Sequence, residues 1–264
     1  MSMSQRFRDS TVLVTGGGGD IGRVIAARLA QEGATIALLD IDQHKLDSAV
    51  AWLSEQGANV AGFCADITDV KALEQAVDTI IERFGSIELL FNNAGYQGAF
   101  QPLHKYPADD FAQVININVV GAFNVLRVVS QHMVERQFGR IVNTASMAGV
   151  QGTPNMAAYS ASKFAMVGLS ETAAKDLAPY NIRVNAISPG FMGPGFMWER
   201  QVELQAKAHS QYYSTDPAEV AEQMINSTPM RRYGALEEIA GSVAYLMSDD
   251  ASYITGINIP IAGG

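Results

Sequence analysis

The chain has 264 residues, of which 48% are hydrophobic and 17% are charged. This is the composition of a globular protein with ample apolar material for a buried core. A net charge of −9 without any basic stripe argues against a nucleic-acid groove. Apolar runs reach only strand length, far short of the roughly 20 residues that span a bilayer, and residues 1–9 lack an apolar signal core. We therefore expect a soluble, cytoplasmic protein that binds neither nucleic acid nor membrane.

The cysteine and histidine content predicts no metal site and no disulfide. Cys64 is the single cysteine, and its apolar surroundings favour a buried structural thiol over a nucleophile. The histidines show no spacing typical of metal ligands or of a catalytic triad; they are His44, His104, His132 and His209.

Short β-branched runs alternate with longer stretches of helical apolar spacing. Strands are expected at 11–15, 34–39, 60–64, 87–91, 139–144, 182–187 and 256–259, and helices at about 20–32, 44–56 and 70–84. Nearly continuous apolar strands joined by helical crossovers predict a parallel sheet with both faces covered. With no linker or repeat, the sequence predicts one α/β domain over 1–264, a Rossmann-like, doubly wound sheet of about seven strands.

Between Pro189 and Arg231 the regular alternation of strand and helix patterns is interrupted. Glycines and prolines open the segment, and a helix is expected at about 197–209. A long insertion after a sheet strand is typical of a binding lid, because open α/β sheets bind ligands beyond the carboxyl ends of their strands. We expect a helical substrate lid at approximately 190–230. The alternative is a surface excursion without a ligand role.

A glycine-rich turn joins the first expected strand to the first expected helix, at 15–22 with the sequence TGGGGDIG. Glycines allow a sharp turn and bring backbone N–H groups close to a pyrophosphate, which the positive end of the helix dipole also attracts. Asp40 ends the second strand, 18 residues after Gly22. Its carboxylate can bind the adenosine ribose hydroxyls and would repel the extra phosphate of NADP, so NAD is preferred. The alternative is that Asp40 caps a helix or is a solvated strand end.

Several ordered motifs together resemble the short-chain dehydrogenase/reductase family over essentially the whole chain. They are TGxxxDIG at 15–22, Asp66, NNAG at 92–95, NVVG at 118–121, Ser146, YxxxK at 159–163 and PG at 189–190. Within the family, the stretches 92–100, 154–159 and 193–200 look like the NAD-dependent xylitol dehydrogenases. The resemblance implies an oxidoreductase that exchanges a hydride with a secondary alcohol.

The residues themselves support this chemistry. Tyr159 and Lys163 are four apart, so on a helix they share one face. A phenol of pKa near 10 needs help to act as a base, and the Lys163 ammonium, with a positively charged nicotinamide ring, would lower the pKa of Tyr159. Ser146 can orient the substrate oxygen, and the resemblance gives Asn118 a water that links Lys163 to solvent. Taken alone, Tyr159 and Lys163 could be an exposed helical pair.

The resemblance also implies a set of cofactor contacts. They are Gly16, Gly19, Asp20, Ile21, Gly22, Asp40, Ile41, Asp66, Ile67, Asn93, Ala94, Gly95, Tyr159, Lys163, Pro189, Gly190 and Met192. Asn92 or Asn93 could instead tie neighbouring strands together. Two positions depart from the family. Asp20 replaces a glycine and puts a negative charge near the pyrophosphate unless its carboxylate turns away. Pro194 replaces a threonine that would bind the carboxamide.

For a polyol or ketose substrate, the pocket needs polar groups that pair with several hydroxyls. Besides Ser146, the candidates are Gln97 and Asn155, with Met156, Met197 and Trp198 as apolar walls; packing within the lid is the alternative for each. The resemblance implies oxidation of xylitol to D-xylulose and a homotetramer. The other hypotheses are a different sugar alcohol, a 3-oxoacyl thioester or a steroid as substrate, and a nucleotide-binding regulatory protein without turnover.

Overall fold

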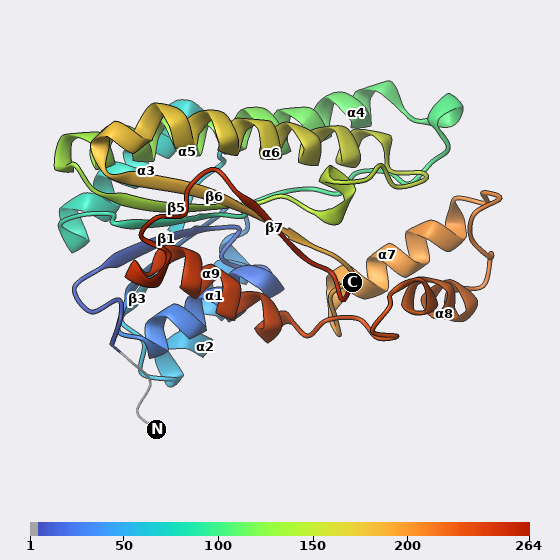
Figure 1. Ribbon diagram of the computed structural model, residues 1–264, viewed down its shortest axis with the longest axis horizontal. Coiled ribbons are helices and arrows are strands. Elements are labelled where there is room, and N and C mark those ends of the chain that lie inside the picture. Colours follow the sequence, from blue (N-terminus) through green and yellow to red (C-terminus); the bar gives the residue numbers. More distant parts are fainter. Residues whose placement is uncertain (1–4) are drawn as a thin grey trace.

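In the computed structural model, which describes residues 5–264, seven parallel strands form one sheet in the order β3-β2-β1-β4-β5-β6-β7 (Figure 1). The strands are β1 (Thr11–Thr15), β2 (Thr35–Asp40), β3 (Val60–Cys64), β4 (Leu89–Asn92), β5 (Gly139–Thr144), β6 (Ile182–Pro189) and β7 (Asn258–Ile261). The order reverses between β1 and β4. In open sheets of this kind, a crevice for ligands forms beyond the strand ends at that point.

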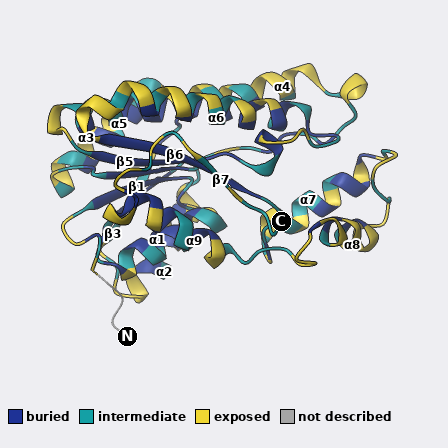
Figure 2. Ribbon diagram, in the orientation of Figure 1, coloured by how far each residue is buried: buried dark blue, intermediate teal, exposed yellow. Residues whose placement is uncertain are grey.

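Helices cover both faces of the sheet. They are α1 (Asp20–Gln31), α2 (Gln43–Glu55), α3 (Val70–Phe84), α4 (Ala108–Ile115), α5 (Ala122–Arg136), α6 (Ala157–Leu177), α7 (Phe196–Lys207), α8 (Pro217–Ser227) and α9 (Leu236–Met247). One apolar core joins the sheet to α1, α2 and α9, and a second joins it to α3, α5 and α6. Figure 2 shows the buried strands between helices whose outer faces are exposed. The expected doubly wound α/β fold is confirmed.

The expected elements are found, with shifts at their ends. The strands at 11–15, 60–64 and 139–144 and the helix at 70–84 have the expected bounds, whereas β7 begins at Asn258 instead of 256. The expectation for Cys64 was wrong, because its thiol is exposed. β3 is an edge strand, so only one of its sides is fully covered, and alternate residues along it face outward.

The segment 190–230 lies beyond the carboxyl ends of the strands (Figure 1). It contains α7, near the expected 197–209, and α8, which the sequence did not predict. The two helices pack on each other through a small apolar cluster that includes Val202, Ala206, Val220 and Met224. This cluster gives the segment its own core, separate from the two cores of the sheet.

One continuous helical stretch is more apolar than the sequence reading allowed. Ala108–Arg136, which spans α4, a π-helical turn and α5, is long and apolar enough to cross a membrane by length and composition alone. Half of its apolar window is buried inside the protein, as in the core helices of water-soluble folds. Its inner face belongs to the core that covers the sheet.

Candidate active site

The glycine turn between β1 and α1 has a backbone that other residues would not tolerate. Gly16 has a φ of +65°, in the left-handed region that favours glycine. A Cβ on Gly22 would lie 2.4 Å from the carbonyl oxygen of Gly16, so the turn and the helix approach too closely for any side chain. Because α1 begins directly after Gly19, its N-terminal N–H groups open onto the turn. Such a turn can hold a pyrophosphate.

Asp40 is part of this turn rather than a helix cap. Its carboxylate accepts hydrogen bonds from the backbone N–H groups of Gly18, at 2.9 Å, and Asp42, at 3.0 Å. The N-cap of α2 is Asp42, which accepts from the N–H of Lys45 at 3.1 Å. The capping alternative for Asp40 is therefore wrong. Its carboxylate stands at the crevice, next to the exposed side chain of Ile41.

Asp20 lies at the first position of α1 and has turned towards the 190–230 segment. A Cβ on Gly195, the N-cap of α7, would lie 3.0 Å from Oδ2 of Asp20. Asp20 does not cap α1, since the N-cap is Gly19 and receives no side-chain hydrogen bond. The carboxylate thus stands beside the N-terminal ends of two helices, where negative charge is favoured.

Asn92 and Asn93 tie strands together with their side chains, as the alternative reading held. Asn92 donates to the carbonyl of Ala122 and to Asn143, and Asn93 donates to the carbonyl of Thr15. The backbone N–H of Asn93 also donates to the hydroxyl of Thr15, at 2.9 Å, which leaves its backbone carbonyl for a cofactor role. Nearby, Asp66 accepts from the N–H and hydroxyl of Thr68, and Ile67 is buried, so both are fixed in place at the end of β3.

Tyr159 and Lys163 lie in the first two turns of α6. Lys163 is only 4% exposed, and its Nζ donates a 2.7 Å hydrogen bond to the carbonyl oxygen of Thr144, the last residue of β5. Its Nζ also lies 5.5 Å from the ring centroid of Tyr159. The reading of Tyr159 and Lys163 as an exposed pair is wrong. The hydroxyl of Ser146 accepts from the N–H of Ala148 at 3.2 Å, which fixes its side chain in the loop after β5.

Burial shifts the acid–base properties of both groups. It raises the pKa of Tyr159 to about 12, and the hydrogen bond with Ser146 offsets only part of this rise. Burial also lowers the pKa of Lys163 to about 8, because no carboxylate in the described part of the chain compensates its charge. In the protein alone, desolvation therefore outweighs the expected lowering of the tyrosine pKa by Lys163.

The side chain of Asn118 makes three hydrogen bonds within the protein. Its Oδ1 accepts from the N–H of Tyr96 at 2.7 Å, while its Nδ2 donates to the carbonyl of Tyr96 at 2.8 Å and to Ser162 at 3.0 Å. This buried side chain belongs to the π-helical turn 116–121 and contacts the loop after β4. Both N–H groups of the amide are therefore used within the protein, and only Oδ1 retains a lone pair for a further donor.

A cavity of about 350 Å³ opens beside these residues. Its lining includes Ser146 and Tyr159, and no Asp, Glu, Lys, Arg or His side chain from residues 5–264 takes part in it. Of the expected cofactor contacts, it contains Ile21, Pro189, Gly190 and Met192. The sequence did not single out several other lining residues, namely Thr144, Met147, Gln151, Thr153, Phe191, Gln201, Thr228 and Ala262. Of these residues, Thr144 could have been predicted to line the site, because it ends a predicted strand.

The substrate candidates separate into two groups. Gln97, Met156 and Met197 line the cavity. Asn155 is buried elsewhere and donates to Gln205 and Ser210, at 2.8 and 2.9 Å. Trp198 packs on Phe191 and Tyr233, with ring centroids 6.0 and 5.2 Å away. For Asn155, which bonds to the 190–230 segment, and for Trp198, which belongs to it, the geometry supports a packing role.

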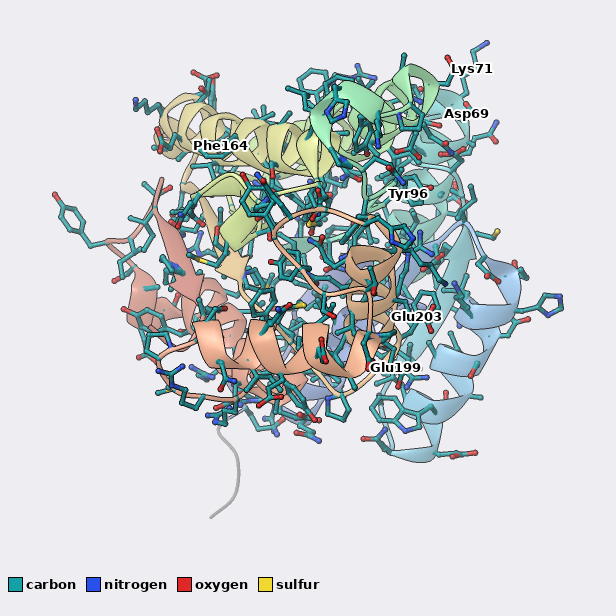
Figure 3. The ribbon with its side chains drawn as sticks, turned by 90° about the vertical axis from the view of Figure 1, so that its right-hand side faces the viewer. Asp69, Lys71, Tyr96, Phe164, Glu199 and Glu203 are labelled. Atoms are coloured by element: carbon teal, nitrogen blue, oxygen red, sulfur yellow. The ribbon has the colours of Figure 1, made fainter. Side chains whose placement is uncertain are left out.

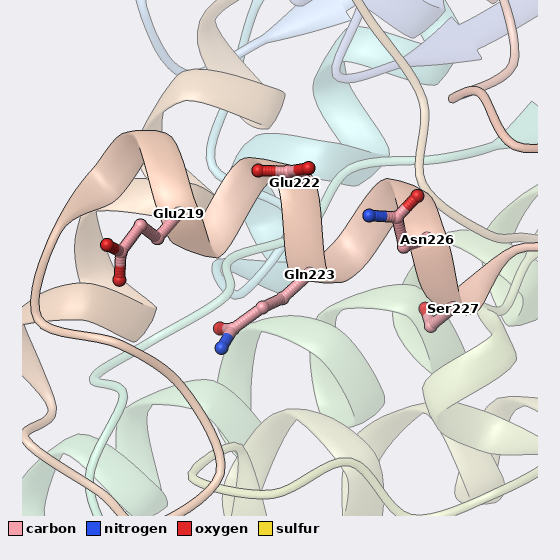
Figure 4. A pocket seen from close by; sticks show the side chains of 5 residues that line it. All are labelled: Glu219, Glu222, Gln223, Asn226 and Ser227. Atoms are coloured by element: carbon pink, nitrogen blue, oxygen red, sulfur yellow. The ribbon is translucent and has the colours of Figure 1, made fainter.

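A second hollow lies along α8, at the same end of the molecule as α7. Figure 3 looks onto the end of the molecule that carries α7, with Tyr96, Glu199 and Glu203 on the same side of the view. The volume of the hollow is about 590 Å³, and it is lined by Glu219, Glu222, Gln223, Asn226 and Ser227. Figure 4 shows these side chains along the helix. All five lie on one helix and are exposed. This open, polar helix face contains no catalytic group.

Comparison with known proteins agrees with the geometry. The family model for short chain dehydrogenases matches residues 10–205. A structure of NAD+-bound xylitol dehydrogenase is similar, with 61% identity, a TM-score of 0.97, and coverage of 98% of this chain and 100% of that one. Levodione reductase of Leifsonia aquatica is 40% identical over 100% of this chain and 96% of its own length. A 3-oxoacyl-[acyl-carrier-protein] reductase of Thermotoga maritima is 34% identical, with 98% of each chain covered.

The family match covers most of the chain, and the relatives match it nearly end to end. The glycine turn, the acidic residue after β2 and the Ser146–Tyr159–Lys163 group are the features on which the sequence resemblance rested. The chain is an oxidoreductase that belongs to the short-chain dehydrogenase family.

Proposed function

We propose that the protein is an NAD-dependent dehydrogenase that oxidises a polyol at a secondary alcohol, with xylitol converted reversibly to D-xylulose. The observation that carries this proposal is a small, uncharged but polar cavity that contains both Ser146 and Tyr159. The similarity to NAD+-bound xylitol dehydrogenase supports the choice of substrate and cofactor.

The glycine turn and Asp40 fit NAD. The turn excludes side chains at Gly16 and Gly22, which allows a diphosphate to approach the start of α1. The Asp40 carboxylate suits a ribose with free hydroxyls and opposes a 2′-phosphate. Asp66, Ile67 and the backbone of 93–95 would hold the adenosine half, and Pro189, Gly190 and Met192 would hold the nicotinamide half. When bound, NAD supplies the hydride acceptor.

Tyr159 acts as the general base in this proposal. Its phenolate accepts the proton of the substrate hydroxyl, which the hydroxyl of Ser146 orients by a hydrogen bond. Because burial raises the pKa of Tyr159 to about 12, ionisation needs nearby positive charge. Lys163 supplies one such charge from the same helix. Since both N–H groups of the Asn118 amide are used within the protein, a water that links Lys163 to solvent could bind this side chain only by donating to its Oδ1.

The cavity favours a small neutral substrate. Ligand sites commonly measure roughly 300–1,000 Å³, so about 350 Å³ lies at the small end, and the nicotinamide ring would share this space. A steroid or an acyl thioester needs more room. A substrate with an anionic group would have no cationic partner among the lining side chains. Hydroxyl and amide side chains of Ser146, Gln151, Thr153 and Gln201 suit a polyol.

We assign the 190–230 segment the role of a substrate lid within a single domain of residues 1–264. Its Phe191, Met197 and Gln201 line the cavity, which supports a ligand role over a surface excursion. The cytoplasm is the proposed location, in keeping with an exposed free thiol at Cys64 and no disulfide among the described residues.

A homotetramer is proposed for the assembled protein. Apolar side chains are exposed along α4, the π-helical turn, α5 and α6, namely Phe111, Val120, Phe123 and Phe164. Apolar patches of this kind mark contact surfaces. A Phe164→Glu variant is expected to reduce the particle mass measured by light scattering, whereas Tyr212→Glu, in an exposed loop of the lid, is not. An unchanged mass for Phe164→Glu would argue against this interface.

The function is tested by mixing the purified protein with NAD or NADP and a panel of alcohols, and by following the absorbance of reduced nicotinamide. The proposal expects turnover with NAD and xylitol and little with NADP. Activity only on acyl or steroid ketones would retain the Tyr159 chemistry and reject the substrate. Binding of NAD without turnover of any alcohol or ketone would favour a regulatory protein.

A further inference from the structure

The side-chain amide of Gln97 is buried without a partner. The residue is 7% exposed, and its Oε1 is enclosed yet accepts no hydrogen bond from residues 5–264. An unsatisfied buried carbonyl of this kind is destabilising, so it is uncommon without a compensating role. Partners for this amide must come from outside the described chain.

Gln97 also lines the catalytic cavity together with Ser146 and Tyr159. Like its Oε1, its Nε2 has no hydrogen bond within the described part of the protein. Rotation of the last side-chain torsion by a half-turn exchanges the amide oxygen and the amide nitrogen. Gln97 can therefore present either an acceptor or a donor to the cavity. A hydroxyl group both donates and accepts, and it matches the amide in either orientation.

The backbone around Gln97 is held on both sides. On one side, Asn118 makes two hydrogen bonds with the backbone of Tyr96, at 2.7 and 2.8 Å. On the other, the Asp110 carboxylate accepts from the N–H of Ala99 at 2.7 Å. Asp110 also accepts from the hydroxyls of Tyr106, at 2.8 Å, and Tyr96, at 3.3 Å. Gln97 therefore stands in a loop that is fixed before any substrate binds.

Tight packing reinforces this loop. Gly98 has a φ of +71°, and a Cβ there would lie 2.5 Å from Val114, 2.7 Å from Asp110 and 2.9 Å from the Tyr106 hydroxyl. Burial and the neighbouring Asp110 raise the pKa of Tyr106 above its usual range, which keeps its hydroxyl protonated as a donor. The loop thus has little freedom to move the unpaired amide to another partner.

From this arrangement we propose that Gln97 determines specificity by binding a substrate hydroxyl on a carbon other than the reacting one, and that Asp110 is its positioning residue. The inference rests on the proposed function and assigns one part of substrate recognition to a single side chain. Sites that pair with a substrate hydroxyl discriminate strongly against molecules that lack it, because the protein group is then left unpaired.

The test compares Gln97→Met with Gln75→Met, which makes the same chemical change at an exposed glutamine of α3, outside the cavity. For xylitol, kcat/KM is expected to fall at least 30-fold in Gln97→Met and less than 3-fold in Gln75→Met. The Kd for NAD, measured by titration, should stay within 2-fold in both, which verifies that the variants are folded. The ratio of kcat/KM for xylitol to kcat/KM for 2-butanol should decrease in Gln97→Met alone.

Asp110→Ala is compared with Asp109→Ala, an adjacent exposed carboxylate in the same first turn of α4. Asp110→Ala is expected to raise the KM for xylitol at least 10-fold with kcat within 3-fold, whereas Asp109→Ala leaves both unchanged. A purely structural role would not separate KM from kcat in this way.

If wild-type protein turns over xylitol and Gln97→Met does so equally well, the inference fails and the proposed function stands. If wild-type protein turns over no polyol, both fail.

Discussion

The carboxylate of Asp40 accepts a 2.9 Å hydrogen bond from the backbone N–H of Gly18. The bond joins the end of β2 to the glycine turn that follows β1. It places a negative charge at the crevice where the sheet order reverses. In the proposed function, the choice of cofactor and the shape of the turn therefore depend on the same side chain.

Replacing Asp40 should shift the choice of cofactor towards NADP. Asp40→Ser removes the charge that opposes a 2′-phosphate and retains a polar side chain. Juxtaposed like charges cost several kcal/mol, so the ratio of kcat/KM for NADP over NAD should rise roughly 100-fold. Steady-state kinetics with both cofactors measures it. Asp42→Ser, which retains a cap for α2, should keep the wild-type ratio; an unchanged ratio in Asp40→Ser would contradict the role of Asp40.

Asp20 should weaken cofactor binding through its charge. Its carboxylate faces Gly195 but remains at the start of α1, close to where a diphosphate would bind. Asp20→Asn is expected to bind NAD about three- to ten-fold more tightly at low ionic strength, with a smaller gain in 0.5 M salt because of screening. Fluorescence titration with NAD measures this. Asp176→Asn, at the far end of α6, is the control, and weaker binding by Asp20→Asn would show that the carboxylate supports the site.

Lys163 should make the stability of the cofactor-free protein depend on pH. Its pKa is lowered from 10.5 to about 8, so between pH 8 and 10.5 the unfolded chain binds more protons than the native one. Stability contributed by this group then rises with pH across that window. One pKa unit corresponds to about 1.4 kcal/mol, so the rise up to pH 10 is about 3 kcal/mol. Above pH 10, the raised pKa of Tyr159 acts in the opposite direction.

Denaturant unfolding from pH 7 to 10 tests this dependence. The Lys163→Met variant should lack the rise that the wild-type protein has. Lys175→Met, on the exposed face of the same helix, should retain it. Parallel pH profiles for the wild-type protein and Lys163→Met would mean that Lys163 is not buried as a costly charge.

The sheet was predictable because each strand has a nearly continuous apolar run of its own. The proximity of Tyr159 and Lys163, the proposed catalytic residues, was predictable because they are four residues apart and the spacing of a helix brings them together. The error at Cys64 has a different origin. Its apolar neighbours suggested burial, but exposure depends on strand order, and no local pattern specifies that β3 is an edge strand.

The features of the site that the sequence did not predict depend on contacts between segments that are distant in the chain. Asn155 and Gln97 are both polar and both near the expected pocket, yet Asn155 is paired with Gln205 and Ser210 while Gln97 has no partner. Which amide is free depends on how α7 packs on the domain. Likewise, the commitment of the Asn118 side chain to Tyr96 and Ser162 follows from a π-helical turn that the sequence did not reveal.

The most direct test of the account is the turnover of xylitol with NAD by Tyr159→Phe, compared with wild-type protein. Removing one hydroxyl keeps the ring and its packing but removes the general base. General-base catalysis contributes typically 10²–10⁴-fold, so kcat should fall at least 100-fold while the Kd for NAD stays within about 2-fold. Wild-type turnover by this variant would contradict the assignment of Tyr159 as the base and, with it, the proposed mechanism.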